Sequence, residues 1–118
     1  MSYDDILWGA VKETLFCTRE EYLATLKDWF VWALEQDGET LALRVSNGPE
    51  FHFVIVKRKS FTMADIRAMV KPLIDSYGYA TTRTPLRDKR QQRFNERLGF
   101  VRVREDQYDV IYRIDKLP

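Results

Sequence analysis

The only histidine of the chain, His52, lies in the apolar run Phe51–Val56, and Glu50 precedes it by two positions. Because side chains alternate along a strand, a strand here would place the imidazole and the carboxylate on the same face. A histidine beside a carboxylate can take up a proton near neutral pH. His52 and Glu50 are therefore candidate catalytic residues for proton transfer. The alternative is that His52 is a packed strand residue whose ring nitrogens are satisfied by neighbours.

A second candidate site follows directly, where four residues precede a predicted helix: Lys57, Arg58, Lys59 and Ser60. Cations beside a helix N-terminus can hold a phosphate, since the backbone N–H groups there point outward and the helix dipole is positive at that end. These four residues are candidates for binding a phosphate-bearing cofactor. The alternative is a solvated basic turn.

A third candidate site is basic. Eight cations and two acidic residues lie between Arg83 and Arg104. On a helix, Arg90, Arg93 and Arg97 would share one face, and Arg102 and Arg104 would share one face of the strand that follows.

The candidate partner-binding residues are Arg87, Arg90, Arg93 and Arg97. Nucleic acid, the phosphates of a cofactor or an acidic protein surface would fit them, including the acidic opening helices of another copy. Stacking aromatics do not interleave with these arginines, so single-stranded nucleic acid is not favoured.

Metal binding is not expected, because the chain has one histidine and one cysteine, Cys17, which we interpret as a small apolar filler. A single cysteine allows no disulfide within the chain, and the opening residues lack a basic segment leading into an apolar stretch. We therefore expect a cytoplasmic location. The longest mainly apolar run, Trp29–Leu34, is far shorter than the roughly 20 residues of a membrane span.

The composition predicts one globular domain over residues 1–118, since 45% of the residues are hydrophobic and 31% are charged. The charge is uneven. Residues 1–50 carry four Lys/Arg and ten Asp/Glu, whereas residues 51–118 carry fifteen and eight. This polarity favours an anionic partner for the second part of the chain, or two parts that complement each other.

Apolar spacing and turn signals predict the elements that position these residues. Capping boxes at Ser2 and Thr18 predict helices over about 3–15 and from 18 to near Asp28, and Asp37-Gly38 predicts a hairpin turn between strands. The run after Pro49 reads as a central strand that is covered on both faces. The remaining predictions are a helix that is capped by Thr62, kinked at Pro72 and closed by Gly78, a strand over 79–84, a helix over Pro85–Leu98, and strands over 100–104 and 108–114.

This order of elements, a three-stranded meander followed by a helix, a strand, a helix and a hairpin, resembles the Gcn5-related N-acetyltransferase (GNAT) fold over about residues 30–114. The stretch Arg93-Phe94-Asn95-Glu96-Arg97-Leu98-Gly99-Phe100 is similar to the closing motif of that family. The resemblance implies a layered α+β fold, with a mixed, mostly antiparallel central sheet flanked by helices. It also implies acetyl transfer from acetyl coenzyme A to an amine. In the family, the strand that corresponds to the one with His52 often carries a Glu or orients a water.

The sequence departs from the family pattern at the cofactor site. Phe61 and Met63 stand where the phosphate-binding loop of the family has small residues. The resemblance places the family's tyrosine, which protonates the leaving thiolate, at Asn95, and an amide is not an acid. It places the family's coenzyme-contacting Asn at Asp88, whose charge would repel a phosphate.

These departures favour an acetyltransferase-like protein with a degenerate acetyl-CoA site, acting as a non-catalytic binding or assembly module. Such compact proteins resemble those of tailed phages, some of which are virion components. No cofactor is then expected, the partner is a protein or a second copy held through the basic C-terminal half, and the location is the host cytoplasm or the virion. The alternative is an active acetyl-CoA-dependent N-acetyltransferase with an altered cofactor loop.

Overall fold

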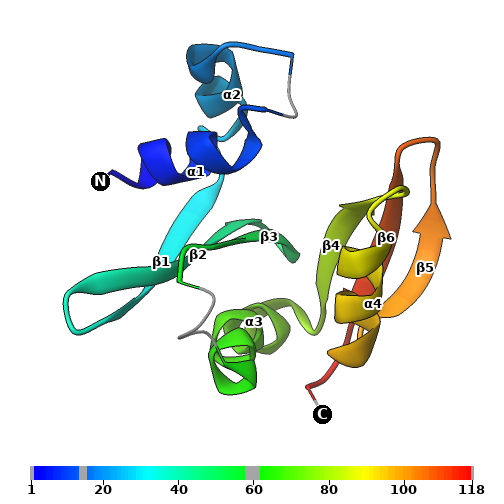
Figure 1. Ribbon diagram of the computed structural model, residues 1–118. Coiled ribbons are helices and arrows are strands. Elements are labelled where there is room, and N and C mark those ends of the chain that lie inside the picture. Colours follow the sequence, from blue (N-terminus) through cyan, green and yellow to red (C-terminus); the bar gives the residue numbers. More distant parts are fainter. Residues whose placement is uncertain (1, 14–15, 58–61, 118) are drawn as a thin grey trace. The chain divides into compact units, whose positions relative to one another are not determined.

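The computed structural model describes residues 2–13, 16–57 and 62–117, and these contain four helices and six strands in the predicted order (Figure 1). Two compact units are formed, and each is described by itself. The first comprises residues 1–47 and 53–62, and the second comprises residues 48–52 and 63–118. The hydrogen-bonded strand order is β1-β2-β3-β4-β6-β5, in which one strand, β3, contributes residues to both units.

Two capped helices open the first unit. Helix α1 (Tyr3–Val11) begins where the Ser2 hydroxyl accepts a hydrogen bond from the backbone N–H of Asp5, and α2 (Arg19–Thr25) begins at a complete capping box of Thr18 and Glu21. Both predicted starts are confirmed, but both predicted ends were too late. Helix α2 ends early because the backbone N–H of Leu26 turns back to Leu23 and that of Trp29 to Leu26, which tightens the chain out of the α-helix.

Strands β1 (Phe30–Gln36) and β2 (Glu39–Asn47) form the predicted antiparallel hairpin. Asp37 and Gly38 both have positive φ, 53° and 79°, as a turn of the mirror-image type requires. Leu7 of α1 packs on Leu43 and Val45 of β2 to make the buried core of this unit, and further apolar side chains close around it. The partly buried side chains are Ile6, Tyr22, Leu26, Trp29, Val31, Ala33 and Val54.

Strand β3 (Glu50–Ile55) is the third of the six strands, so its predicted central place is confirmed. The predicted coverage of both faces is wrong, because Phe51 is its one buried residue and the other five are partly exposed. Its parallel ladder with β4 consists of a single pair, Glu50 with Thr81. The Thr82 hydroxyl adds a side-chain bond to the carbonyl of Phe51, at 2.9 Å. Apolar residues at nearly every position therefore did not indicate a strand covered on both sides.

The second unit contains α3 (Met63–Tyr77), β4 (Ala80–Pro85), α4 (Lys89–Arg97), β5 (Val101–Glu105) and β6 (Asp109–Ile114). Helix α3 continues through Pro72 and ends before Gly78, whose φ of 85° is the left-handed conformation that a C-cap favours. The predicted helix start at Pro85 is wrong. Pro85 is the last residue of β4, and Asp88 caps α4 by accepting a 3.0 Å hydrogen bond from the backbone N–H of Gln91.

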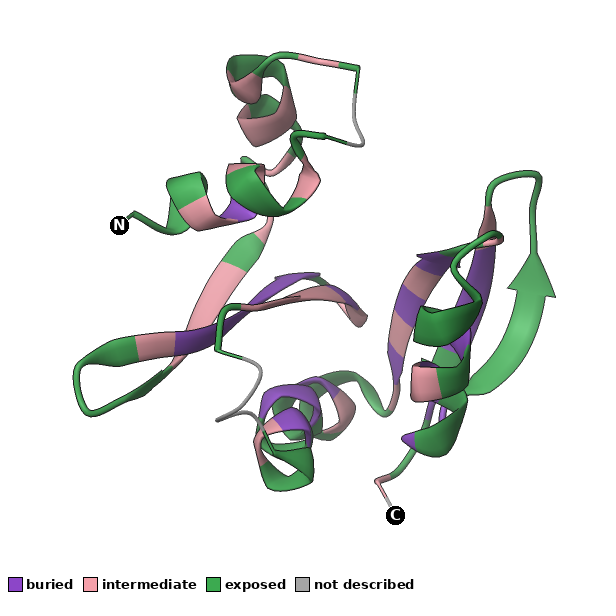
Figure 2. Cartoon of the chain, viewed as in Figure 1, coloured by how far each residue is buried: buried purple, intermediate pink, exposed green. Residues whose placement is uncertain are grey.

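Helix α4 packs on the sheet of the second unit by one face, while the edge strand β5 is exposed along its whole length (Figure 2). A register shift lies between Arg102 and Arg104, which pair with the adjacent residues Tyr112 and Ile111 of β6. The two arginines are thus turned to opposite faces, and the prediction that they share one face is wrong. A bulge reverses the alternation on which that prediction depended.

Candidate functional site

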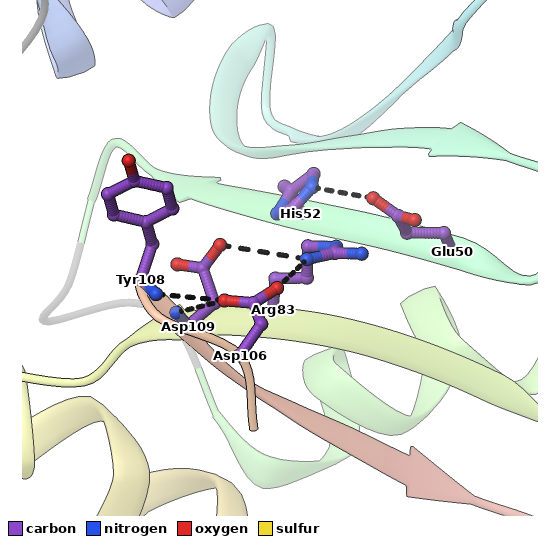
Figure 3. A network of polar contacts seen from close by, with 6 residues as sticks. All are labelled: Glu50, His52, Arg83, Asp106, Tyr108 and Asp109. Atoms are coloured by element: carbon purple, nitrogen blue, oxygen red, sulfur yellow. Dashed lines mark hydrogen bonds and ion pairs between the residues drawn. The ribbon is translucent and has the colours of Figure 1, made fainter. Parts of the chain in front are cut away.

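A cluster of charged side chains lies on β3, β4 and the turn between β5 and β6, all within the second unit (Figure 3). Nε2 of His52 lies 3.3 Å from Oε2 of Glu50, so the two predicted catalytic residues do come together on one face of β3. Both side chains are half-buried. The pairing that the alternation of the strand predicted is therefore present, and whether it is catalytic stays a prediction.

In the same cluster, Arg83 of β4 forms ion pairs with Asp106 and Asp109. Its guanidinium lies 3.0 Å from a carboxylate oxygen of Asp106 and 3.7 Å from one of Asp109. The second oxygen of Asp106 accepts the backbone N–H groups of Tyr108 and Asp109, at 2.9 and 2.8 Å. These backbone bonds, with Arg83 as a smaller cause, lower the pKa of Asp106 below its usual value. The turn between β5 and β6 is thus fixed by one carboxylate, as Figure 3 shows.

The environment of His52 decides its charge. Partial burial lowers its pKa below the ordinary value of 6.5, because the charged ring is poorly solvated there. The carboxylate of Glu50 and the more distant Asp109 oppose this effect, and Arg83 adds to it. The lowered pKa of His52 favours the neutral imidazole at pH 7, beside the carboxylate of Glu50. A neutral imidazole in that setting can accept a proton from a group brought to it.

Sequence reasoning missed three members of this cluster, Arg83, Asp106 and Asp109. The turn at Asp106 was predicted, and an Asp that accepts from the N–H groups two and three residues further on is an ordinary turn signal. The ion pairs with Arg83 depend on the register of β4 against β6, in which Arg83 pairs with Ile111. No spacing along the chain expresses that register.

Of the four predicted phosphate-binding residues, only Lys57 is among the described ones, and Arg58, Lys59 and Ser60 lie outside them. Lys57 is exposed, with its Nζ 3.9 Å from a carboxylate oxygen of Glu39. Phe61 also lies outside the described residues, so the idea that it blocks the loop stays a prediction. Met63 is the first residue of α3, and its side chain is 45% exposed.

Asn95 occupies the position where the resemblance to acetyltransferases places a tyrosine, and the structure gives it a packing role. It is 3% exposed, and its Nδ2 donates a 2.8 Å hydrogen bond to the hydroxyl of Thr84 in β4. Its Oδ1 accepts from Nε2 of Gln91, and its backbone carbonyl accepts from the N–H groups of Leu98 and Phe100. Its Nδ2 thus joins α4 to the sheet, and its backbone carbonyl helps to end the helix.

Asp88, at the other departing position, also has a structural role, since its side chain caps α4. The described side chains therefore do not fit the reactive end of acetyl coenzyme A as the family binds it. An amide stands in place of the proton donor, and it is buried with its Nδ2 donating to Thr84 and its Oδ1 accepting from Gln91.

The arginines of the α4 region form the third predicted site. Arg87, Arg90, Arg93 and Arg97, hereafter the arginine row, are all exposed. Within the part of the chain that the structure describes, no carboxylate lies within 4 Å of any of them. The opposite side of α4 is buried, where Gln92 donates to two backbone carbonyls and accepts from Arg102. Helix α4 thus presents Arg90, Arg93 and Arg97 outward, and Arg87 lies just before its cap.

The described residues also line two pockets. A pocket of about 560 Å³ lies in the first unit, and a smaller one of about 40 Å³ lies between α3 and the end of α4. The larger is lined by Asp5, Ile6, Gly9, Ala10, Lys12, Val54, Ile55 and Val56. Among residues 2–13, 16–57 and 62–117 there is no group of three metal-ligating side chains, and none of the helices there is long and apolar enough to cross a membrane.

Comparison by sequence finds no matching family model and no matching curated protein. Comparison by structure finds acetyltransferases. The N-acetyltransferase PseH of Campylobacter jejuni, solved in complex with acetyl coenzyme A, is 13% identical, with 98% of this chain and 93% of that chain covered at a TM-score of 0.66. The ribosomal-protein-S18-alanine N-acetyltransferase of Escherichia coli is 14% identical, with 97% and 89% covered at a TM-score of 0.58.

A protein of Desulfovibrio desulfuricans assigned to the GNAT acetyltransferase family is 14% identical, with 96% of this chain and 92% of that chain covered at a TM-score of 0.59. Identities this low support a likeness of fold rather than of activity. The predicted α+β class, with a mostly antiparallel sheet and flanking helices, is confirmed. The chain has the fold of the Gcn5-related N-acetyltransferases.

Proposed function

We propose that this acetyltransferase-like protein works as a non-catalytic binding module, and that it docks an acidic protein surface on the arginine row. The observation that carries the proposal is the buried hydrogen bond between Asn95 and Thr84. Because of this bond, the residue at the position of the family's proton donor serves to pack α4 against the sheet. The same helix then offers its outer face, Arg90, Arg93 and Arg97, for contact.

The charge of this face supports a binding role. Cations at positions i, i+3 and i+7 lie on one side of a helix, over a length of about 10 Å. Arginine is also the cation best suited to interfaces, because its planar guanidinium forms paired hydrogen bonds with a carboxylate. Exposed arginines that no carboxylate of the described chain neutralises retain their full attraction for an outside anion.

Both units belong to one domain in this proposal, since β3 supplies residues to each. The likeness to tailed-phage proteins, the assembly role within a virion and the location in the host cytoplasm stay predictions.

Coenzyme binding tests the proposal. A ligand at a hundred times its dissociation constant stabilises a fold by roughly 2.7 kcal/mol, which a melting experiment readily detects. We expect millimolar acetyl coenzyme A to leave the melting temperature unchanged and to release no free thiol with a panel of primary amines. Thiol release that depends on both protein and amine would overturn the proposal.

A second function, acetyl transfer to an amine, is favoured by one observation, the contact of His52 with Glu50. A neutral imidazole held by a carboxylate could remove the proton of an ammonium group, which must be lost before an amine can attack. If the chain is an acetyltransferase, His52→Ala and Glu50→Gln should both lower turnover, and the first variant should lower it more. Thr81→Ser, on the same face, serves as the matched control and should leave turnover unchanged.

A further inference from the structure

The first unit carries an acidic surface at the tip of its hairpin. Residues 35–39 are exposed without exception, and they include three carboxylates. We call Glu35, Asp37 and Glu39 the acidic tip. Within the described chain, the nearest cation to them is Lys57, 3.9 Å from Glu39. An ion pair that long between exposed groups neutralises little of the charge.

The backbone of the acidic tip is well defined. Gln36 pairs with Glu39 across the hairpin, and the two turn residues between them have the φ values of a tight mirror-image turn. The Tyr3 hydroxyl donates a 2.7 Å hydrogen bond to Glu35 from α1. Little ordering entropy is therefore lost when this tip docks, because its shape exists before binding.

The acidic tip and the arginine row complement each other in charge. Gln36 pairs with Glu39 across the hairpin, so Glu39 and Glu35 lie on opposite faces of it, with Asp37 in the turn at its end. The tip therefore carries negative charge on both faces, and the arginines of α4 extend over about 10 Å. Opposite charges on two surfaces also steer them together before contact. Each surface is thus a fitting partner for the other.

We propose that the acidic tip of one copy of this chain docks on the arginine row of a second copy. This inference rests on the proposed binding function and names its partner. Since every copy carries both surfaces, the contact is either made twice, which closes a two-fold dimer, or repeated from copy to copy, which builds a longer assembly. The molecular mass in solution distinguishes these two results, and both agree with the inference.

Charge reversal tests it. In sedimentation velocity at about 0.15 M salt, wild type should sediment as a dimer or a larger assembly and should dissociate in about 1 M salt, where charges are screened within about 3 Å. Arg90→Glu with Arg93→Glu should lower the association constant more than about tenfold, and so should Glu35→Lys with Glu39→Lys. An equimolar mixture of the two variants should associate again, because the new acidic row meets the new basic tip and the unchanged surfaces still match.

Lys71→Glu with Lys116→Glu is the matched control, since it changes the net charge equally at exposed cations outside the arginine row. This control should associate like wild type, and all variants should keep the melting temperature of wild type. Wild type that is monomeric at high protein concentration and low salt would overturn the inference, as would reversed variants that remain associated. Neither result depends on coenzyme binding, so the proposed function is tested independently of this inference.

Discussion

The side-chain amide of Asn95 donates a 2.8 Å hydrogen bond to the hydroxyl of Thr84, and both residues are buried. This bond joins α4 to β4 at the position where acetyltransferases of this fold are expected to hold a tyrosine. A buried polar pair is costly to break, because the group left behind has lost its water as well as its partner. Asn95 therefore has a structural reason to be an amide.

Asn95→Leu should lower the free energy of unfolding by about 1–3 kcal/mol, because the Thr84 hydroxyl is left buried without this donor. Thr84→Val, for the same reason, should also destabilise the protein. The double variant should be more stable than the sum of the two single effects predicts, since it removes both polar partners together. Chemical denaturation of the four proteins measures the coupling.

Gln91→Ala is the control for this cycle, because Gln91 is exposed and bonds only the other atom of the Asn95 amide. We expect it to change stability by less than about 0.5 kcal/mol. Equal losses for Gln91→Ala and Asn95→Leu would show that the buried bond is not what joins the helix to the sheet.

Asp88 should matter as a helix cap rather than as a cofactor residue. Asp88→Ala should cost about 1 kcal/mol of stability, whereas Asp88→Asn should cost little, because the amide oxygen can still accept the N–H of Gln91. Thermal melts of both variants measure the difference. A gain of acetyl coenzyme A binding in Asp88→Asn would instead favour the cofactor role that the family assigns to this position.

Stability should fall as the solution is acidified below pH 6.5, because of His52. Its pKa is lowered in the folded state, so the unfolded chain binds more protons just below the ordinary pKa of 6.5, and protonation then favours unfolding. We expect the loss between pH 7.5 and 5.5 to be less than about 1 kcal/mol, since the side chain is 43% exposed and solvent screens it.

His52→Gln should abolish this dependence, and the measurement is a set of melts at each pH for both proteins. The carboxyl groups with lowered pKa, such as Asp106, lose their stabilising effect only at more acidic pH, below their usual value of 3.8. They do not interfere within the chosen window. If His52→Gln still loses as much stability as wild type between pH 7.5 and 5.5, another titrating group causes the loss.

Local signals predicted much of this fold. Ser2 and Thr18 mark helix starts because a hydroxyl before a helix satisfies a free N–H group, and Asp37-Gly38 marks a hairpin because both residues tolerate positive φ. Such devices act within a few residues, so the sequence displays them directly. The order of elements followed from them, and with it the likeness to acetyltransferases.

Other features depend on contacts that no local pattern carries. Pro85 ends a strand instead of starting a helix because the next turn places Asp88 at the cap. The bulge after Arg102 and the ion pairs of Arg83 both follow from strand register. The candidate site was thus predicted at Glu50 and His52, which are two residues apart, and missed where its members come from distant segments.

The most direct test of whether this chain binds a protein partner and does not transfer an acetyl group is a calorimetric titration. Acetyl coenzyme A is titrated into the wild-type protein up to millimolar concentration. No saturable heat is expected, because the side chains of Asn95 and Asp88 already hold α4 in place. A saturable heat of acetyl coenzyme A binding to the wild-type protein would contradict this expectation.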